Sequence, residues 1–184
     1  MGQRHYRMQF DWFFIGGDDL FVFPQNLKDL LGRYNSSEPH YLGKRWHSEG
    51  RIGFNNGGPG YALSRPALEC LVEHLSDTRC LPEGKSFQED VLTAVCLARA
   101  CNIHYEDTRD EQERERFHHF DPATESDAEI MGQMEWYKNL SVGGIKLGKD
   151  CCAPDTVSFH YIKNPVLIRY LHHYVHNCKR RIES

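Results

Sequence analysis

Residues 13–23, Phe-Phe-Ile-Gly-Gly-Asp-Asp-Leu-Phe-Val-Phe, constrain the fold of this chain more than any other stretch. Two short apolar runs, rich in aromatic and β-branched residues, flank a pair of glycines and a pair of carboxylates. This pattern predicts a buried strand, a tight break and a second short strand. Asp18 and Asp19 lie at the break. Burial of both carboxylates there would cost several kcal/mol unless a cation neutralised them.

Two interpretations of this acidic pair follow from the residues alone. Carboxylate oxygens are hard ligands that suit Mg²⁺ or Mn²⁺, and such ions are commonly held by one or two acids together with substrate phosphates. The simpler alternative is an ordinary polar turn between two strands. The pair by itself does not distinguish the two.

Composition restricts the class of protein. The chain has 184 residues, 40% of them hydrophobic and 26% charged, which is the balance of a single globular domain. A formal net charge of −4 gives no electrostatic footprint for nucleic acid, so no nucleic-acid partner is expected. No apolar run approaches the roughly 18 residues that a membrane span requires, and the N-terminal residues lack the apolar segment of a signal peptide.

The cysteines favour a disulfide-bearing secretory domain. None of them forms the C-x₂-C pair that is typical of zinc sites; they are Cys70, Cys80, Cys96, Cys101, Cys151, Cys152 and Cys178. The adjacent Cys151 and Cys152 are expected to pair elsewhere, because a ring between neighbours strains the peptide. Glycosylation sequons at Asn35 and Asn139 fit the same compartment. The odd number of cysteines and the missing targeting segment suggest a piece of a longer protein.

Hydrophobic periodicity predicts alternating strands and helices. The expected strands cover residues 10–15, 20–23, 41–42, 102–105 and 156–162. The expected helices cover residues 24–31, 64–77, 89–100 and 164–175. Residues 57–60 are glycine-rich and residues 106–116 are a charge run, so their simplest interpretations are a mobile connection and a solvated segment.

Several polar residues have a structural interpretation beside a functional one. Glu89 and Asp90 open a predicted helix, where acids commonly cap free amides. His118 lies between phenylalanines, as core histidines often do. His172 and His176 are one helical turn apart and could hold a metal, although the polar face of an amphipathic helix explains them equally well.

The order of six motifs carries a family resemblance. They are Asp-Asp between apolar runs at 13–23, Gly-Gly-x-Gly-Tyr-x-Leu-Ser at 57–64, Glu-Asp-Val at 89–91, Asp-x-Arg-Asp at 107–110, Phe-His-x-Phe at 117–120, and Cys-Cys-x-x-Asp-x-Val-Ser-Phe-His-Tyr at 151–161. Together they resemble the core 1 β1,3-galactosyltransferases, which belong to the inverting glycosyltransferase family that also holds Fringe. The resemblance extends over residues 12–176.

The resemblance implies an α/β fold of the GT-A type, with a mixed sheet flanked by helices, and a UDP-sugar bound through Mn²⁺. Asp18 and Asp19 then occupy the last two places of an acidic triplet, with Asp19 as the direct metal ligand. Gly17 stands where the family usually has another acid. His160 is an implied metal ligand, and His118 a lesser one.

The resemblance also implies the roles of the remaining site residues. Asp90 matches the general base that takes the proton of the acceptor hydroxyl, and Glu89 orients the base or contacts the acceptor. The substrate-binding positions that it implies are Gly57, Gly58, Gly60, Tyr61, Trp136 and Tyr137.

The whole-protein properties are expectations from the same resemblance. Residues 1–184 would form one domain, the C-terminal part of a GT-A catalytic domain without its N-terminal nucleotide-binding strands, so one sheet edge would be open. The parent would be a single-pass type II membrane protein of the Golgi lumen, whose anchor is not in this chain. Its substrates would be UDP-galactose and GalNAc on Ser or Thr of a glycoprotein, and it would form a homodimer.

Two alternatives remain open. One is a Fringe-like β1,3-transferase with another donor or acceptor. The other is a non-catalytic relative that acts as a chaperone or binding module. The acids at 18–19 and 89–90 argue for an enzyme, whereas Gly17 argues for the non-catalytic relative.

Overall fold

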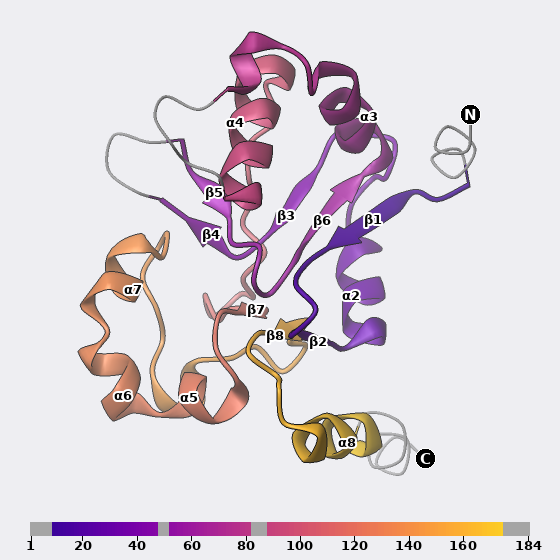
Figure 1. Cartoon of the computed structure of the whole chain (residues 1–184). Coiled ribbons are helices and arrows are strands. Elements are labelled where there is room, and N and C mark those ends of the chain that lie inside the picture. The colour runs from indigo at the N-terminus through magenta and orange to yellow at the C-terminus, as the bar shows by residue number, and fades with distance from the viewer. Residues whose placement is uncertain (1–8, 48–51, 82–87, 175–184) are drawn as a thin grey trace.

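The computed structural model describes residues 9–47, 52–81 and 88–174 of the chain, which form the predicted α/β fold (Figure 1). Its strands are β1 (Trp12–Ile15), β2 (Phe21–Val22), β3 (Tyr41–Gly43), β4 (Arg45–Trp46), β5 (Phe54–Asn55), β6 (Tyr61–Ser64), β7 (Phe117–His118) and β8 (Ser158–Phe159). Its helices are α2 (Pro24–Leu31), α3 (Arg65–His74), α4 (Glu89–Cys101), α5 (Pro122–Ser126), α6 (Ala128–Gln133), α7 (Glu135–Leu140) and α8 (Pro165–His173), with 3₁₀ turns η1 (Thr78–Cys80) and η2 (Gly148–Asp150).

Of the two three-stranded sheets, the larger sheet has the longer strands, in the antiparallel order β1-β6-β3. Side chains of a strand alternate between the two faces of its sheet. Tyr61 and Leu63 of β6 therefore pack with α3 and α4, whereas Ala62 packs with Leu31 of α2. Figure 1 shows α3 and α4 on one side of this sheet and α2 on the other. β1 lies at one edge of this sheet.

A second sheet positions the acidic break. β2 pairs with β8 in antiparallel fashion, and β8 pairs with β7 in parallel, so that both kinds of pairing occur in one sheet, as predicted. Phe21 lies opposite Phe159, which directly precedes His160. The break between β1 and β2 is therefore held beside the end of β8.

Two disulfides, Cys70–Cys101 and Cys80–Cys96, tie together α3, η1 and α4. The third joins Cys151 to Cys152, so the prediction that these neighbours pair elsewhere is wrong. The four other described cysteines pair with one another around α3 and α4. Among the described residues, Cys151 and Cys152 therefore have only each other as disulfide partners. Cys178 and His176 lie outside the described residues.

The structure corrects two further predictions. The strand expected at 102–105 is absent from the described residues: Asn102 ends α4 with φ 54°, and the following segment makes only a single bridge, from Glu106 to Leu42. The charge run at 106–116 is not fully solvated, because Glu115 and Arg116 are buried and form ion pairs with Lys44 and Asp155, respectively. β6, the middle strand of the larger sheet, was not predicted.

Among the described residues, no helix combines the length and hydrophobicity that a membrane crossing requires.

Lys44 forms a buried ion pair that we expect to be important for stability. Its side chain is 0% exposed, and its Nζ lies 2.8 Å from Oε1 of Glu115, itself mostly buried. Removing one partner of a buried pair leaves an uncompensated charge, so Lys44→Met should lower the free energy of unfolding by about 3–5 kcal/mol. Urea denaturation measures this loss.

The double variant Lys44→Met/Glu115→Gln is the matched control. It removes both charges, and much of the lost stability should return. A single Lys44→Met variant as stable as the wild type would contradict the prediction.

Candidate active site

The structure brings two predicted metal ligands, Asp19 and His160, into contact. Asp19 lies in the break after β1, and its backbone carbonyl accepts a hydrogen bond of 2.7 Å from the amide of Ile162. His160 follows β8, and its Nε2 lies 3.0 Å from Oδ1 of Asp19. The pairing of β2 with β8 therefore aligns the two side chains.

The orientation of the His160 ring is compatible with metal binding. Its Nδ1 lies 3.2 Å from the backbone carbonyl oxygen of His119, which can only accept, so Nδ1 carries a proton. In the neutral ring Nε2 then holds the lone pair that faces Asp19, an arrangement typical of metal-binding histidines. An octahedral ion with ligands at roughly 2.1 Å places neighbouring ligand atoms about 3 Å apart. The 3.0 Å between Nε2 and Oδ1 therefore fits a shared divalent cation.

The neighbours of Asp19 contribute differently. Asp18 is exposed, and in the described part of the chain we find no hydrogen bond or ion pair of its side chain. At Gly17 an added Cβ would lie 3.2 Å from Oδ1 of Asp19, so a larger residue would crowd the carboxylate. Only Asp19 of the acidic pair faces His160.

His118 does not belong to this group. It is 1% exposed, and its ring stacks on Phe159 with centroids 4.5 Å apart. Its Nε2 lies 3.2 Å from the hydroxyl oxygen of Thr156, and its Nδ1 3.9 Å from the sulfur of Cys152. The core interpretation of His118 is therefore confirmed, and none of these ring contacts involves Asp19 or His160.

Asp90, the predicted base, connects the start of α4 to residues 57–60, the glycine loop. Its Oδ1 accepts from the amide of Val91 at 2.8 Å, and its Oδ2 from the amide of Gly57 at 2.9 Å. Burial raises the pKa of Asp90, and the two amides oppose this only in part, so that the pKa stays above its ordinary value. Capping accounts for the bond to Val91 but not for the bond to the loop.

Glu89 is held by two side-chain donors. Its Oε1 accepts from the hydroxyl of Tyr61 and, at 3.0 Å, from that of Thr93. The Tyr61 side chain is 0% exposed, and burial, followed by the bond to Glu89, raises its pKa. Tyr61 can therefore influence a substrate only through Glu89.

The glycine loop joins the two halves of the site. The amide of Gly57 binds Asp90, while a Cβ added to Gly58 would lie 2.4 Å from Nδ1 of His160. Any larger residue at 58 would displace the ring that faces Asp19. The glycines thus connect Asp90 with the pair of Asp19 and His160, and their direct contact with a substrate stays a prediction.

Gly60 has a separate structural requirement. Its φ is 81°, and an added Cβ would lie 2.4 Å from the ring of Phe14 in β1. A side chain at Gly60 would therefore disturb the pairing that starts β6. The loop is anchored at this end, so the interpretation as a mobile connection is not needed.

The predicted aromatic pair is split by burial. Trp136 is 49% exposed, whereas Tyr137 is 1% exposed and donates its hydroxyl to buried Glu125. Sequence reasoning missed Tyr161, which is 43% exposed and stacks on His160 with centroids 3.9 Å apart. The ring of His119 lies 5.8 Å from Trp136 and 5.5 Å from Tyr161. The sequence signal for Tyr161 was its position directly after His160 in the last motif.

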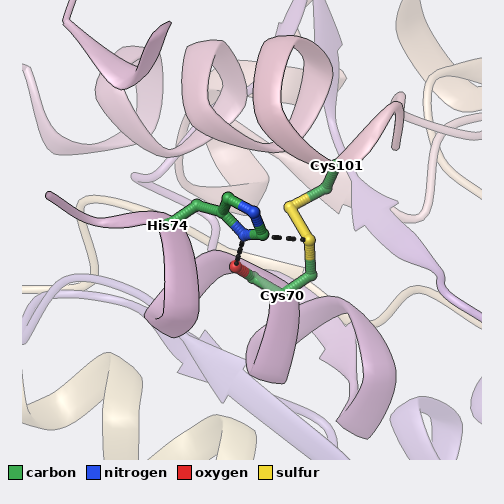
Figure 2. A group of neighbouring side chains, drawn as sticks. All are labelled: Cys70, His74 and Cys101. Carbon is green, nitrogen blue, oxygen red and sulfur yellow. Dashed lines mark hydrogen bonds between the residues drawn. A yellow bond between two sulfur atoms is a disulfide. The ribbon is translucent and has the colours of Figure 1, made fainter. Parts of the chain in front are cut away.

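A second cluster of metal-ligand types lies on the opposite side of the larger sheet from α2. Cys70, His74 and Cys101 are the only described group of three such residues with ligand atoms within 4.8 Å of one another. Figure 2 shows that a disulfide joins the two sulfurs, so neither is a thiolate. Nδ1 of His74 lies 2.9 Å from the carbonyl oxygen of Cys70. The cluster is structural.

Buried His118 and His119 predict acid sensitivity. Burial is the main cause that lowers the pKa of His118 to about 3 and that of His119 to about 4. Unfolded histidines titrate near about 6.5, so below that pH the unfolded chain takes up protons that the folded chain does not. The contribution of the two neutral histidines to the free energy of unfolding is therefore complete above about pH 6.5, and it is lost progressively as the pH falls toward 4.

Urea denaturation between pH 7 and pH 4.5 checks this prediction. His118→Gln should flatten the pH dependence, whereas substitution of exposed His104 by glutamine should leave it unchanged. Equal slopes in all three proteins would refute the assignment.

Comparisons with known proteins agree with these observations. Residues 2–166 match the family described as Fringe-like. Glycoprotein-N-acetylgalactosamine 3-beta-galactosyltransferase 1 of Xenopus laevis is 34% identical over 160 residues, which are 86% of this chain and 44% of the relative. Mouse chondroitin sulfate synthase 3 is 33% identical over 105 residues, 52% of this chain and 12% of the relative. Mouse beta-1,3-glucosyltransferase is 29% identical over 98 residues, 52% of this chain and 19% of the relative. The chain thus spans less than half the length of each of these relatives.

Proposed function

Because this chain belongs to the Fringe-like family of β1,3-glycosyltransferases, we propose that it is catalytic sequence of an inverting enzyme that transfers galactose from UDP-galactose to GalNAc on Ser or Thr of glycoproteins. The observation that carries the proposal is the contact between Asp19 and His160, joined through the glycine loop to Asp90. The choice of donor and acceptor rests on the Xenopus relative and on the motif at 151–161.

Oδ1 of Asp19 and Nε2 of His160 would hold Mn²⁺. A carboxylate with one imidazole is an acceptable donor set for this ion, and the 3.0 Å between the two atoms suits it. A bound divalent cation supplies neutralisation of the charge that develops on the departing diphosphate. His119 contributes through its carbonyl, which fixes the tautomer of the His160 ring.

Asp90 would act as the general base. Each of its carboxylate oxygens accepts one amide and keeps a further lone pair for the proton of the acceptor hydroxyl. Burial raises its pKa, which makes it a better proton acceptor than an ordinary aspartate. Glu89, fixed by Tyr61 and Thr93, would orient the acceptor beside it.

The acceptor sugar would lie against exposed aromatic rings. Trp136 and Tyr161 both expose large ring surfaces and flank His119. A flat ring suits the apolar face of a sugar. Tyr137 would support Trp136 from the core, where it is anchored by Glu125.

The second candidate is a Fringe-like transfer with another donor or acceptor. Relatives named as a chondroitin sulfate synthase and a glucosyltransferase match about half of this chain, so the shared core is compatible with several sugars. A non-catalytic role is less well supported, because the structure brings Asp19, His160 and Asp90 around one loop.

A donor panel distinguishes these candidates. The chain and its full reading frame would be incubated with Mn²⁺, a GalNAc-α-Thr peptide and, in turn, UDP-galactose, UDP-glucose, UDP-GlcNAc and UDP-glucuronic acid. Transfer from UDP-galactose alone supports our proposal, and transfer from another donor supports the second candidate. A folded protein that binds neither Mn²⁺ nor UDP would support the non-catalytic role.

We propose the Golgi lumen as the compartment and a type II membrane protein as the parent. The disulfides within α3, η1 and α4 suit an oxidising compartment. Asn35 of the first sequon is exposed, whereas Ser141 of the second is buried, so glycosylation is expected at Asn35. A homodimer remains a proposal from the resemblance, and sedimentation analysis tests it.

A further inference from the structure

The carboxylate of Asp19 has a second charged partner, Lys163. Its Oδ1 faces His160, and its Oδ2 lies 3.2 Å from Nζ of Lys163. The Asp19 side chain is 22% exposed and that of Lys163 is 69% exposed. The ammonium group therefore lies on the solvent side of the carboxylate, where an incoming ligand would arrive.

The turn at residues 161–163 presents this ammonium group. The amide of Ile162 donates to the carbonyl of Asp19, and that of Lys163 to the carbonyl of Tyr161 at 3.1 Å. Tyr161 has a φ of 57°, and Nζ of Lys163 lies 5.4 Å from the centre of its ring. Lys163 is thus held between the predicted metal ligand and the exposed aromatic ring.

Charge makes this arrangement unfavourable for a cation that binds alone. Both oxygens of the Asp19 carboxylate already have a partner, since Oδ1 contacts His160 and Oδ2 contacts Lys163. A divalent cation bound to Asp19 would break the ion pair between Asp19 and Lys163 and would lie close to the positive charge of Lys163. An anion that contacts both cations removes this repulsion.

We propose that Lys163 is a diphosphate-binding residue of this site, which pairs with Asp19 in the ligand-free protein and pairs with the diphosphate of the donor when a divalent cation occupies Asp19. The inference rests on the proposed function and adds to it a coupling between cation and nucleotide. Lys163 disfavours the cation alone and favours the cation together with the diphosphate. By linkage, each ligand then strengthens the binding of the other.

A purely structural role of Lys163 would predict that Lys163→Gln lowers the stability of the fold and leaves the ligand affinities unchanged. An ion pair this exposed adds little to folding stability, so Lys163→Gln should unfold like the wild type. Only the ligand affinities should change. Lys163→Arg keeps the positive charge and should retain the wild-type affinities to within about threefold.

The test measures Mn²⁺ binding by electron paramagnetic resonance, and UDP binding by calorimetry with and without Mn²⁺. For Lys163→Gln we expect Mn²⁺ alone to bind about fivefold more tightly and UDP with Mn²⁺ about tenfold more weakly. Uridine, which lacks the diphosphate, should bind both proteins equally. Exposed Lys149 gives the matched control, and Lys149→Gln should behave like the wild type.

Two results would overturn the inference. If the wild type binds Mn²⁺ and UDP, and Lys163→Gln binds both with unchanged affinity, the role of Lys163 fails while the proposed function stands. If the wild type binds neither ligand, the inference and the donor half of the proposed function fail together.

Discussion

Replacing Asp90 with asparagine is expected to lower the rate of sugar transfer by about 10²–10⁴-fold, the usual contribution of a positioned general base. The amide cannot take the proton of the acceptor hydroxyl. Its oxygen can still accept from one of the two amides that now bind Asp90, so the start of α4 should stay folded. The change should appear in kcat, while Mn²⁺ binding stays as in the wild type.

Asp127 provides the matched control for this variant. It is also an aspartate at a helix N-terminus, where it caps α6 and accepts from the amides of Glu129 and Ile130. Asp127→Asn should leave the transfer rate unchanged. An Asp90→Asn enzyme that keeps more than a tenth of the wild-type rate would exclude Asp90 as the base.

Replacing Asp19 with alanine should remove both Mn²⁺ binding and Mn²⁺-dependent transfer. Loss of a residue that only supports a metal ligand costs about 10–100-fold in metal affinity, and loss of the ligand itself should cost more. Circular dichroism would confirm the fold, and electron paramagnetic resonance would measure the affinity.

The adjacent Asp18 is a sharp comparison for Asp19. Its side chain is exposed, whereas that of Asp19 contacts His160, so Asp18→Ala should weaken Mn²⁺ far less. The reverse order, with Asp18→Ala inactive and Asp19→Ala active, would show that the metal assignment is wrong.

Local patterns were sufficient for the elements that present the site. The apolar runs around the acidic break predicted β1 and β2, and the amphipathic periods predicted α2, α4 and α8. The resemblance then indicated Asp19, His160 and Asp90, which the structure brings around one loop. The predictions of these elements were confirmed because each depends on residues close together in sequence, whereas the roles of Asp19, His160 and Asp90 stay predictions.

The missed features depend on contacts between distant parts of the chain. β6 has only four residues after a glycine-rich loop, so its identity as a middle strand comes from pairing with β1 and β3. The burial of Tyr137 comes from Glu125, and the position of Lys163 from Asp19. The bond between Cys151 and Cys152 depends on which other cysteines were already paired.

The configuration of the product, followed over time by proton NMR, tests whether the transfer is inverting. The reaction contains UDP-galactose, a GalNAc-α-Thr peptide, Mn²⁺ and the full reading frame that contains this chain. The proposed function predicts β1,3-linked galactose as the first product, and this product should be lost on chelation of Mn²⁺ and in the Asp90→Asn variant. An α-linked first product, or transfer at the wild-type rate without Asp90, would contradict it.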